Sequence, residues 1–289
     1  MNVLVFANTS LDGAGSTLLI KWLYKEKLRE FIIVEATETN IVNEINSRQK
    51  HFNNYDKIFV VGICLSEVQI REVDKHSIVV FDHHASHTHL LHNYNNSKGI
   101  VEESTSCVSL IHSKFKSAIN ISPEQELLLK YVDDYNSFNL KYNDSLKLSA
   151  IFFTYNRPKV SKFVEYFENG MRPYNIQEKN SIKIYIKQFK EQLENKPNFG
   201  NIKNYRAVAI FANNLVSNIA HYIISKYKAD IGIVINLDTN SVSFRRCTHC
   251  DIDVSILSKT FCEGSGSICA SGGKLTPQFA NLLKDFKPC

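Results

Sequence analysis

The sequence predicts an α/β protein with two domains, a parallel doubly wound sheet domain followed by a smaller mixed α/β domain. Short β-branched runs alternate with amphipathic stretches, a pattern typical of parallel sheets that carry helices on their faces. The strand runs are almost continuously apolar, which indicates that both faces of the first sheet are covered. The 289 residues also exceed the length that one hydrophobic core usually serves.

Four strands are expected in the first part of the chain. They cover residues 3–6, 31–34, 58–61 and 78–81. Amphipathic runs at 16–24 and 41–47 separate the first three strands. Because parallel strands need crossover connections, these two runs are the helices that such a sheet requires.

After residue 92 the pattern becomes helical. A Ser/Thr cluster begins a helix at 104–116, and a serine cap followed by proline and acidic residues begins another at 122–134. The lysine-rich segment 175–195 is expected to form a connecting helix. Residues 196–200 combine proline and glycine, so they are the best candidate for a linker.

A second alternation of strands and helices follows this linker. The expected strands are 207–211, 231–235 and 241–245, and the expected helices are 215–227 and 252–261. Two glycine-rich turns come after the last helix. We therefore expect one domain over residues 1–190 and a second over residues 200–289.

The composition is that of an ordinary globular protein, with 44% hydrophobic and 22% charged residues. No apolar segment approaches the ~18 residues of a membrane span, so we expect no membrane association. The net charge of +5 is compatible with a phosphate-bearing ligand but is far too small for a nucleic-acid coat. Seven cysteines without regular spacing indicate a reducing compartment, and we expect a cytoplasmic protein.

Asp82, His83 and His84 directly follow the strand at 78–81. The carboxyl ends of parallel strands are where open α/β sheets bind ligands. Imidazole and carboxylate together suit Mn²⁺, Zn²⁺ or Fe²⁺. The motif alone also fits an ordinary surface loop, so its interpretation depends on the rest of the chain.

Other segments of the chain join this motif in a recognisable order. They are 8–16, 62–66 and 133–138 in the first half, and 242–246, 253–255 and 264–273 in the second. Together with the Asp-His-His motif, this order resembles the DHH phosphoesterases and their associated C-terminal domain. That family includes RecJ-type exonucleases, short-oligonucleotide ribonucleases, exopolyphosphatases and family II pyrophosphatases. The resemblance extends over nearly the whole chain.

The resemblance implies a centre in which two Mn²⁺-type ions activate water for attack on a phosphoryl group. This sequence departs from that pattern at three ligand positions. Asn8 stands where the family has histidine, Ser10 where it has aspartate, and Gly62 where it has the aspartate that bridges the two ions. The first ion would therefore lose every protein ligand.

The second ion would keep Asp12, His83 and Asp134. We expect Asp134 rather than Asp133 to be the ligand, because Phe138 lies four residues after Asp134, as the family pattern has it. These three residues could hold at most one Mn²⁺ or similar divalent ion. The alternative is that no metal binds and the three residues are hydrogen-bonded remnants.

His84 is the histidine that meets the transferred phosphate in the family, and the resemblance places it, with Asp82, at the reacting group. His87, His89 and His92 continue this segment. We interpret these three histidines as solvated loop residues rather than as replacement metal ligands.

The substrate side is expected in the second domain. The candidate residues are Arg245, Arg246, Gly264, Ser265, Gly266 and Ser267. Glycines allow a phosphate to approach the backbone, serines donate hydrogen bonds, and the arginine fork suits a phosphate. Because side chains alternate along a strand, only one of the two arginines should face the ligand. Two solvated arginines at a strand end remain an equal alternative.

Four cysteines of the second half are Cys247, Cys250, Cys262 and Cys269. They are of the ligand type found in structural zinc sites. The second pair is spaced too widely for a usual site, so unpaired cysteines are the preferred interpretation over a zinc site.

Taken together, the sequence predicts a divergent DHH phosphoesterase-like protein that acts on or binds nucleotides or short single-stranded oligonucleotides. A catalytically inactive binding protein is the first alternative, and a scaffold without phosphoester binding is the second. The sequence leaves the substrate and the oligomeric state open.

Overall fold

The computed structural model describes residues 1–137, 139–247, 250–266 and 268–288. The chain forms two compact units, Met1–Ser181 and Ile182–Cys289. Helix α8 (Ile176–Leu193) contains the boundary between them. Among the described residues, none of the helices combines the length and apolar character that crossing a bilayer requires.

The first unit contains a five-stranded sheet in the order β2-β1-β3-β4-β5, in which every pair is parallel. The strands are β1 (Asn2–Asn8), β2 (Glu30–Ala36), β3 (Lys57–Val61), β4 (Val79–Asp82) and β5 (Lys98–Val101). The first four confirm the expected strands. β5 was not predicted, because its four residues include a lysine and a glycine and show neither an apolar run nor alternation.

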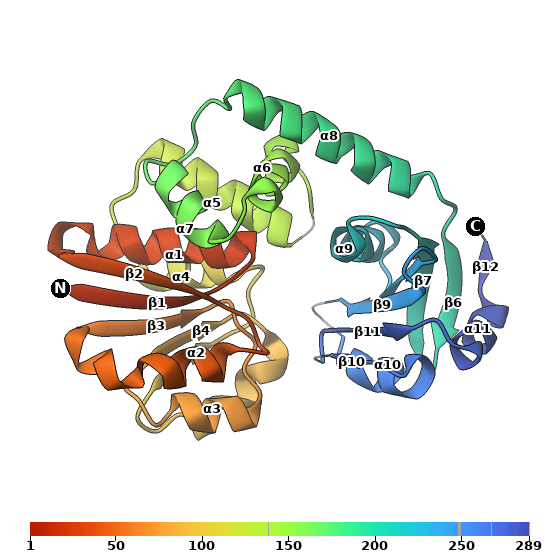
Figure 1. Ribbon diagram of the computed structural model, residues 1–289, viewed down its shortest axis with the longest axis horizontal. Helices are drawn as coiled ribbons and strands as arrows, with labels where there is room; N and C mark the ends of the chain where they lie inside the picture. The colour runs from red at the N-terminus through yellow and green to blue at the C-terminus, as the bar shows by residue number, and fades with distance from the viewer. Residues whose placement is uncertain (138, 248–249, 267, 289) are drawn as a thin grey trace. The chain divides into compact units, whose positions relative to one another are not determined.

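Helices cover both faces of this sheet (Figure 1). One face carries α1 (Leu11–Tyr24), α4 (Cys107–Phe115), α5 (Pro123–Asn136), α6 (Asn143–Thr154) and α7 (Lys159–Tyr166), and the other carries α2 (Ile41–Arg48) and α3 (Glu67–Val73). Short 3₁₀ segments cover Lys25–Lys27, Gln49–Asn54 and Ala85–Asn93. The sheet is therefore buried on both sides, as its continuous apolar strands indicate.

The register of the sheet brings three strand ends to the same edge. Ala7 of β1 pairs with Val61 of β3, and Val61 pairs with Phe81 of β4. The residues that follow Ala7, Val61 and Phe81 are therefore neighbours at the carboxyl edge of the sheet. These residues are Asn8, Gly62 and Asp82.

The chain turns sharply from β1 into α1 at this edge. Ser10 is the N-cap of α1, and its side chain accepts a hydrogen bond from the N–H of Gly13 at 3.0 Å. A Cβ on Gly13 would lie 2.1 Å from the carbonyl oxygen of Asn8. Only glycine permits this close approach, which sets the direction in which α1 leaves the sheet.

The second unit contains a seven-stranded mixed sheet in the order β10-β11-β9-β8-β7-β6-β12. The strands are β6 (Asn198–Ile202), β7 (Tyr205–Phe211), β8 (Ile231–Asn236), β9 (Ser241–Arg246), β10 (Ser265–Gly266), β11 (Ala270–Lys274) and β12 (Lys287–Pro288). Only β7 and β8 pair in parallel. The helices are α9 (Val216–Tyr227), α10 (Val254–Cys262) and α11 (Pro277–Leu282), with a 3₁₀ turn at Leu283–Asp285.

The linker expected at residues 196–200 is wrong. Its last three residues belong to β6, which pairs antiparallel with β7. Gly200 is needed there for packing, because a Cβ would lie 2.5 Å from the ring of Phe286. Proline and glycine therefore mark an outer strand of the sheet and not a flexible connection.

The loop that precedes β5 is held by one carboxylate. Asp74, just after α3, is buried, and its Oδ1 accepts the N–H groups of Asn95, Asn96 and Ser97 at 2.9, 3.0 and 2.8 Å. Burial acts to raise the pKa of Asp74, but the N–H donors outweigh it and hold the pKa below its ordinary value. The end of the segment that follows Asp82 is thereby fixed to α3.

We predict that Asp74→Ala lowers the free energy of unfolding by about 1–3 kcal/mol, because three N–H groups lose their acceptor and that of Ser97 is buried. Asp74→Asn keeps an oxygen acceptor, so it should retain most of the stability at neutral pH. The ionised carboxylate stabilises the fold above the pKa that Asp74 has when unfolded. This contribution disappears as the pH falls through the lowered folded-state pKa.

Urea unfolding of the wild type and both variants at a series of pH values measures these effects. The difference between wild type and Asp74→Asn should shrink in acid. An alanine variant as stable as the wild type at neutral pH would contradict the assigned role of Asp74.

Candidate functional site

The structure brings the family-like segments of the first unit together at the carboxyl edge of its sheet. A Cβ on Gly62 would lie 3.6 Å from the Cβ of Asn8 and 3.8 Å from Oδ2 of Asp12. Gly62 therefore occupies the place between these segments that a bridging ligand would need. Its φ of +66° is a left-handed conformation that favours glycine.

Asp12 is buried in the first turn of α1. Its Oδ2 accepts the N–H of Cys107 and its Oδ1 accepts the N–H of Val108, each at 3.0 Å. Burial raises the pKa of Asp12 to about 6, although these two N–H donors oppose the shift. Both carboxylate oxygens are thus engaged with the start of α4, where the helix N-terminus favours negative charge.

His83 faces Asp12 across the site. Its Nδ1 lies 3.8 Å from Oδ2 of Asp12, beyond hydrogen-bond distance, and is a buried atom without a hydrogen-bond partner among the described residues. Burial, reinforced by the charge of His84, lowers the pKa of His83 to about 3. His83 is therefore a neutral imidazole at physiological pH, which is the form that binds metals.

The other expected metal ligand, Asp134, forms hydrogen bonds with the segment between α5 and α6. Its carboxylate accepts the N–H groups of Lys141 and Tyr142 at 3.0 and 3.1 Å and the hydroxyl of Ser145 at 2.6 Å. These contacts hold the turn between α5 and α6. They give Asp134 a structural role, and the contacts do not support its assignment as a ligand.

Asp133 is the carboxylate whose charge reaches Asp12, where it acts to raise the pKa. It accepts hydrogen bonds from the hydroxyls of Thr105 and Ser106, both at 2.5 Å. Our preference for Asp134 rested on its spacing to Phe138, which lies outside the described residues. Asp133 and Asp134 thus have different hydrogen-bond partners, and the choice of Asp134 as a ligand stays a prediction.

The two substituted residues of the first segment contribute to the fold. Asn8 donates from its side-chain amide to Glu38 at 3.2 Å, and Ser10 caps α1. An amide or a hydroxyl side chain binds Mn²⁺ more weakly than a carboxylate or an imidazole does. The positions that would hold the first ion are thus used for hydrogen bonding.

The residues present do not fit a two-metal centre. Of the family's ligand set, only Asp12 and His83 remain together, and both oxygens of Asp12 already accept backbone hydrogen bonds. Two protein ligands are fewer than stable divalent metal sites normally use. The pocket at Asp12 therefore offers a weak single position at most.

A second cluster of potential ligands surrounds Asp82, which is buried at the end of β4. Its Oδ1 lies 2.6 Å from Nδ1 of His84, and its Oδ2 lies 2.5 Å from Nδ1 of His87. Cys64 completes the group, with Sγ 3.1 Å from Nδ1 of His84. Burial acts to raise the pKa of Asp82, but the two histidines outweigh it and hold the pKa far below its ordinary value.

The interpretation of His87 as a solvated loop residue is wrong. His87 is buried against Asp82, whereas His89, two residues later, is exposed. The signal in the sequence is the spacing of three between His84 and His87, which a tight 3₁₀ turn places on one side. The sequence contains no pattern that predicts the contact of Cys64 with His84. That contact depends on the pairing of β3 with β4.

The two arginines of β9 lie on opposite faces of the strand, as alternation along a strand predicts. Arg245 is half-buried and donates to the Ser217 hydroxyl of α9 at 2.8 Å. Arg246 is buried, and it donates to the carbonyl of Cys250 and to Sγ of Cys269. Arg246 is therefore part of the interior, and Arg245 is the arginine that can meet a ligand.

The glycine-rich turn forms the edge of the same sheet. A Cβ on Gly264 would lie 2.1 Å from the carbonyl oxygen of Gly272, so glycine is required for this close packing. Ser265 and Gly266 form the exposed strand β10, and Gly266 pairs with Ser271. A phosphate-binding role for this turn stays a prediction. The fourth candidate of the turn, Ser267, lies outside the described residues.

The cysteines of the second unit do not come together as a metal site. Among the described residues, which omit 248 and 249, no three of the four cysteines Cys247, Cys250, Cys262 and Cys269 approach within ligand distance of one another. Cys269 instead contacts the guanidinium of Arg246, and Cys262 is buried in α10.

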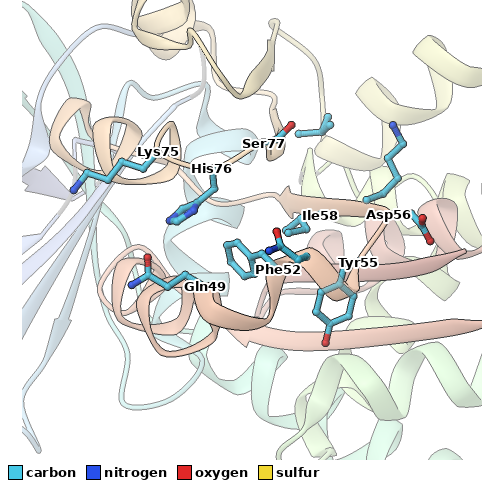
Figure 2. A pocket seen from close by; sticks show the side chains of 11 residues that line it. Gln49, Phe52, Tyr55, Asp56, Ile58, Lys75, His76 and Ser77 are labelled. Carbon is cyan, nitrogen blue, oxygen red and sulfur yellow. The ribbon is translucent and has the colours of Figure 1, made fainter.

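A pocket of about 570 Å³ lies away from this chemistry (Figure 2). Phe52 and His76 line it, together with Lys57 and Val79 at the amino ends of β3 and β4. The candidate site lies at the carboxyl ends of the same strands. The pocket therefore faces the opposite edge of the sheet and has no part in the site.

No protein-family model matches this sequence, and no curated protein matches it. Several solved structures, however, have a fold similar to that of this chain. A pGpG-specific phosphodiesterase from Vibrio cholerae has 12% identity and a TM-score of 0.57, with 98% of this chain and 96% of that chain covered. The DHH domain of a protein assigned to a family of ribosomal proteins has 12% identity and a TM-score of 0.56, with 99% and 87% covered. The exonuclease RecJ bound to manganese has 9% identity and a TM-score of 0.51, with 98% and 88% covered.

These similarities extend over both units of the chain, at sequence identities that reveal the fold alone. They agree with the parallel five-stranded sheet, the mixed second sheet and the Asp-His-His motif at the end of β4. The chain therefore has the fold of the DHH phosphoesterases.

Proposed function

We propose that this protein binds nucleotides or short single-stranded oligonucleotides through their phosphodiester groups and does not hydrolyse them by two-metal chemistry. The observation that carries this proposal is the state of the family-like pocket. The fold is retained, while the positions of both ions have lost ligands and Asp12 is hydrogen-bonded to α4. Losing the shared ligand of a catalytic unit removes most of its rate.

Arg245 supports a phosphate-binding role on the second unit. Its guanidinium is half-buried and is oriented by the Ser217 hydroxyl. A partly desolvated arginine held in one orientation recognises phosphate better than a fully solvated one. Ser265 and the backbone at Gly264 and Gly266 would add hydrogen bonds next to it, as the sequence predicts.

A slow hydrolase that uses one ion is a second candidate. The observation in its favour is the buried Nδ1 of His83, which has no hydrogen-bond partner among the described residues and faces Asp12. At most one Mn²⁺ or similar divalent ion would bind here, and in this version Asp82 would orient His84 toward the phosphate. The bound ion would polarise a phosphoryl oxygen.

Two further properties belong to this proposal. One structural neighbour is a pGpG-specific phosphodiesterase, which makes a dinucleotide the first ligand to test. The six described cysteines form no disulfide, which supports a cytoplasmic protein. The oligomeric state is left open.

We predict that a fluorescent dinucleotide binds to the full chain equally well in the presence of a chelator and of Mn²⁺. Turnover of the dinucleotide should not exceed the rate without protein, because no bridged hydroxide can form. Isothermal titration and a chromatographic hydrolysis assay measure the two properties.

Mn²⁺-dependent turnover that His83→Ala abolishes would favour the one-ion hydrolase instead. Absence of dinucleotide and oligonucleotide binding under every condition would contradict both candidates and leave only a scaffold role.

We predict that Arg245→Ala weakens dinucleotide binding about 10- to 100-fold, the cost of losing one charged hydrogen-bond donor to phosphate. Arg71→Ala is the matched control, because it removes the same charge from an exposed position on α3. Its affinity should equal that of the wild type. Equal losses in the two variants would mean that binding depends on net charge and not on Arg245.

A further inference from the structure

Four potential metal ligands converge in a group that contains none of the expected ligands Asp12, His83 and Asp134. Cys64, Asp82, His84 and His87 each offer one ligand atom, and these atoms all lie within 4.8 Å of one another. They come from the loop after β3, the end of β4 and the 3₁₀ segment Ala85–Asn93 that follows it. None of the four replaces Asp12, His83 or the missing bridge.

The separations of these atoms suit a single small ion. Ligand atoms of a tetrahedral zinc site with bonds of about 2.0–2.3 Å lie about 3.3–3.7 Å apart. The separations here are 3.1 Å for Cys64 to His84, 2.6 Å for Asp82 to His84 and 2.5 Å for Asp82 to His87. An ion therefore requires these three contacts, two of which use different oxygens of Asp82, to lengthen by about 1 Å or less. The chosen ligand atoms already lie within 4.8 Å of one another.

The four side chains of the group differ in burial. Asp82 and His87 are buried, whereas Cys64 and His84 are half-buried. The side chain of His84 is 22% exposed and that of Asp82 only 4%. Asp82 and His87 are thus the enclosed members of the group, and His84 and Cys64 are the accessible ones.

The chemistry of the donors selects among metals. A thiolate and two imidazoles are the ligands that zinc takes in proteins, while Mn²⁺ prefers sites built from oxygen. The carboxylate of Asp82 and the thiolate of Cys64 would balance the two charges of a divalent ion. The set is therefore complete in number, type and charge for zinc.

We propose that Cys64, Asp82, His84 and His87 form a zinc site that differs from the metal centre of the DHH phosphoesterases. With four protein ligands the site is closed, and closed zinc sites are structural. The ion ties the 3₁₀ segment Ala85–Asn93 to the ends of β3 and β4. This proposal does not depend on the proposed binding function, since the site contains no residue of the second unit. It does use Asp82 and His84, which the one-ion hydrolase would need at the phosphate.

The test uses the full chain, stripped of metal by a chelator and then titrated with Zn²⁺, Mn²⁺ or Co²⁺ in turn. We expect one equivalent of Zn²⁺ to bind much more tightly than Mn²⁺ and to raise the thermal midpoint. Cobalt should give a thiolate-to-metal charge-transfer band and the strong ligand-field bands of tetrahedral coordination. Zinc that leaves the midpoint unchanged, or cobalt without a thiolate band, would overturn the proposal.

Matched variants locate the site. Cys64→Ser should abolish the thiolate band, while Cys250→Ser, in the other unit, should leave it unchanged. Loss of a residue that only hydrogen-bonds to a metal ligand weakens metal binding about 10- to 100-fold. His87→Gln removes a ligand itself, so it should weaken zinc binding at least as much. His89→Gln, which alters an exposed histidine two residues away, should have no effect.

The metal-free variants are compared with the metal-free wild type by circular dichroism, so that loss of binding is separated from loss of folding. His87→Gln is chosen because its amide can still bond to Asp82 in the absence of metal. A band that persists in Cys64→Ser but disappears in Cys250→Ser would place zinc in the second unit and refute the site proposed here.

Discussion

The buried carboxylate of Asp12 is the constraint on which the geometry of the first unit depends. It lies on the first turn of α1 and accepts two N–H groups at the first turn of α4. These groups would otherwise be unsatisfied donors inside the protein, each costing free energy. Asp12 thus fixes one helix against another, directly beside the carboxyl ends of β1, β3 and β4. Its presence is explained without any metal.

This explains which parts of the family-like pocket remain. Asp12 and Asp134 satisfy backbone N–H groups, so replacing either would leave donors without acceptors, and those at Asp12 are buried. Ligands whose only partner is a metal carry no such cost once the metal is gone. The positions of Asn8 and Gly62 are of that second kind. Retention in this pocket therefore follows hydrogen bonding and is poor evidence for catalysis.

Much of the fold could be predicted from the sequence, because long apolar runs and helix caps are local signals. The first four strands of the five-stranded sheet and the cap at Ser122 are examples. β5 was missed because its four residues show neither an apolar run nor alternation. β6 was missed because its glycine and the proline before it are also typical of a linker. The site was predicted less well. Whether Asp133 or Asp134 faces Asp12 depends on the helix phase at its end, and the place of His87 depends on a 3₁₀ turn. Neither is encoded in residue type.

The conformation of Gly62 bears on how such a chain could change. At a φ of +66°, an aspartate would have to adopt a strained backbone, at a cost of order 1–3 kcal/mol. Although a side chain would have room there, the carboxylate would gain nothing until other ligands and an ion were present. Replacing Gly62 by aspartate alone would therefore lower stability without completing a set of metal ligands. The backbone at this position suits glycine better than the aspartate that a two-metal centre would need.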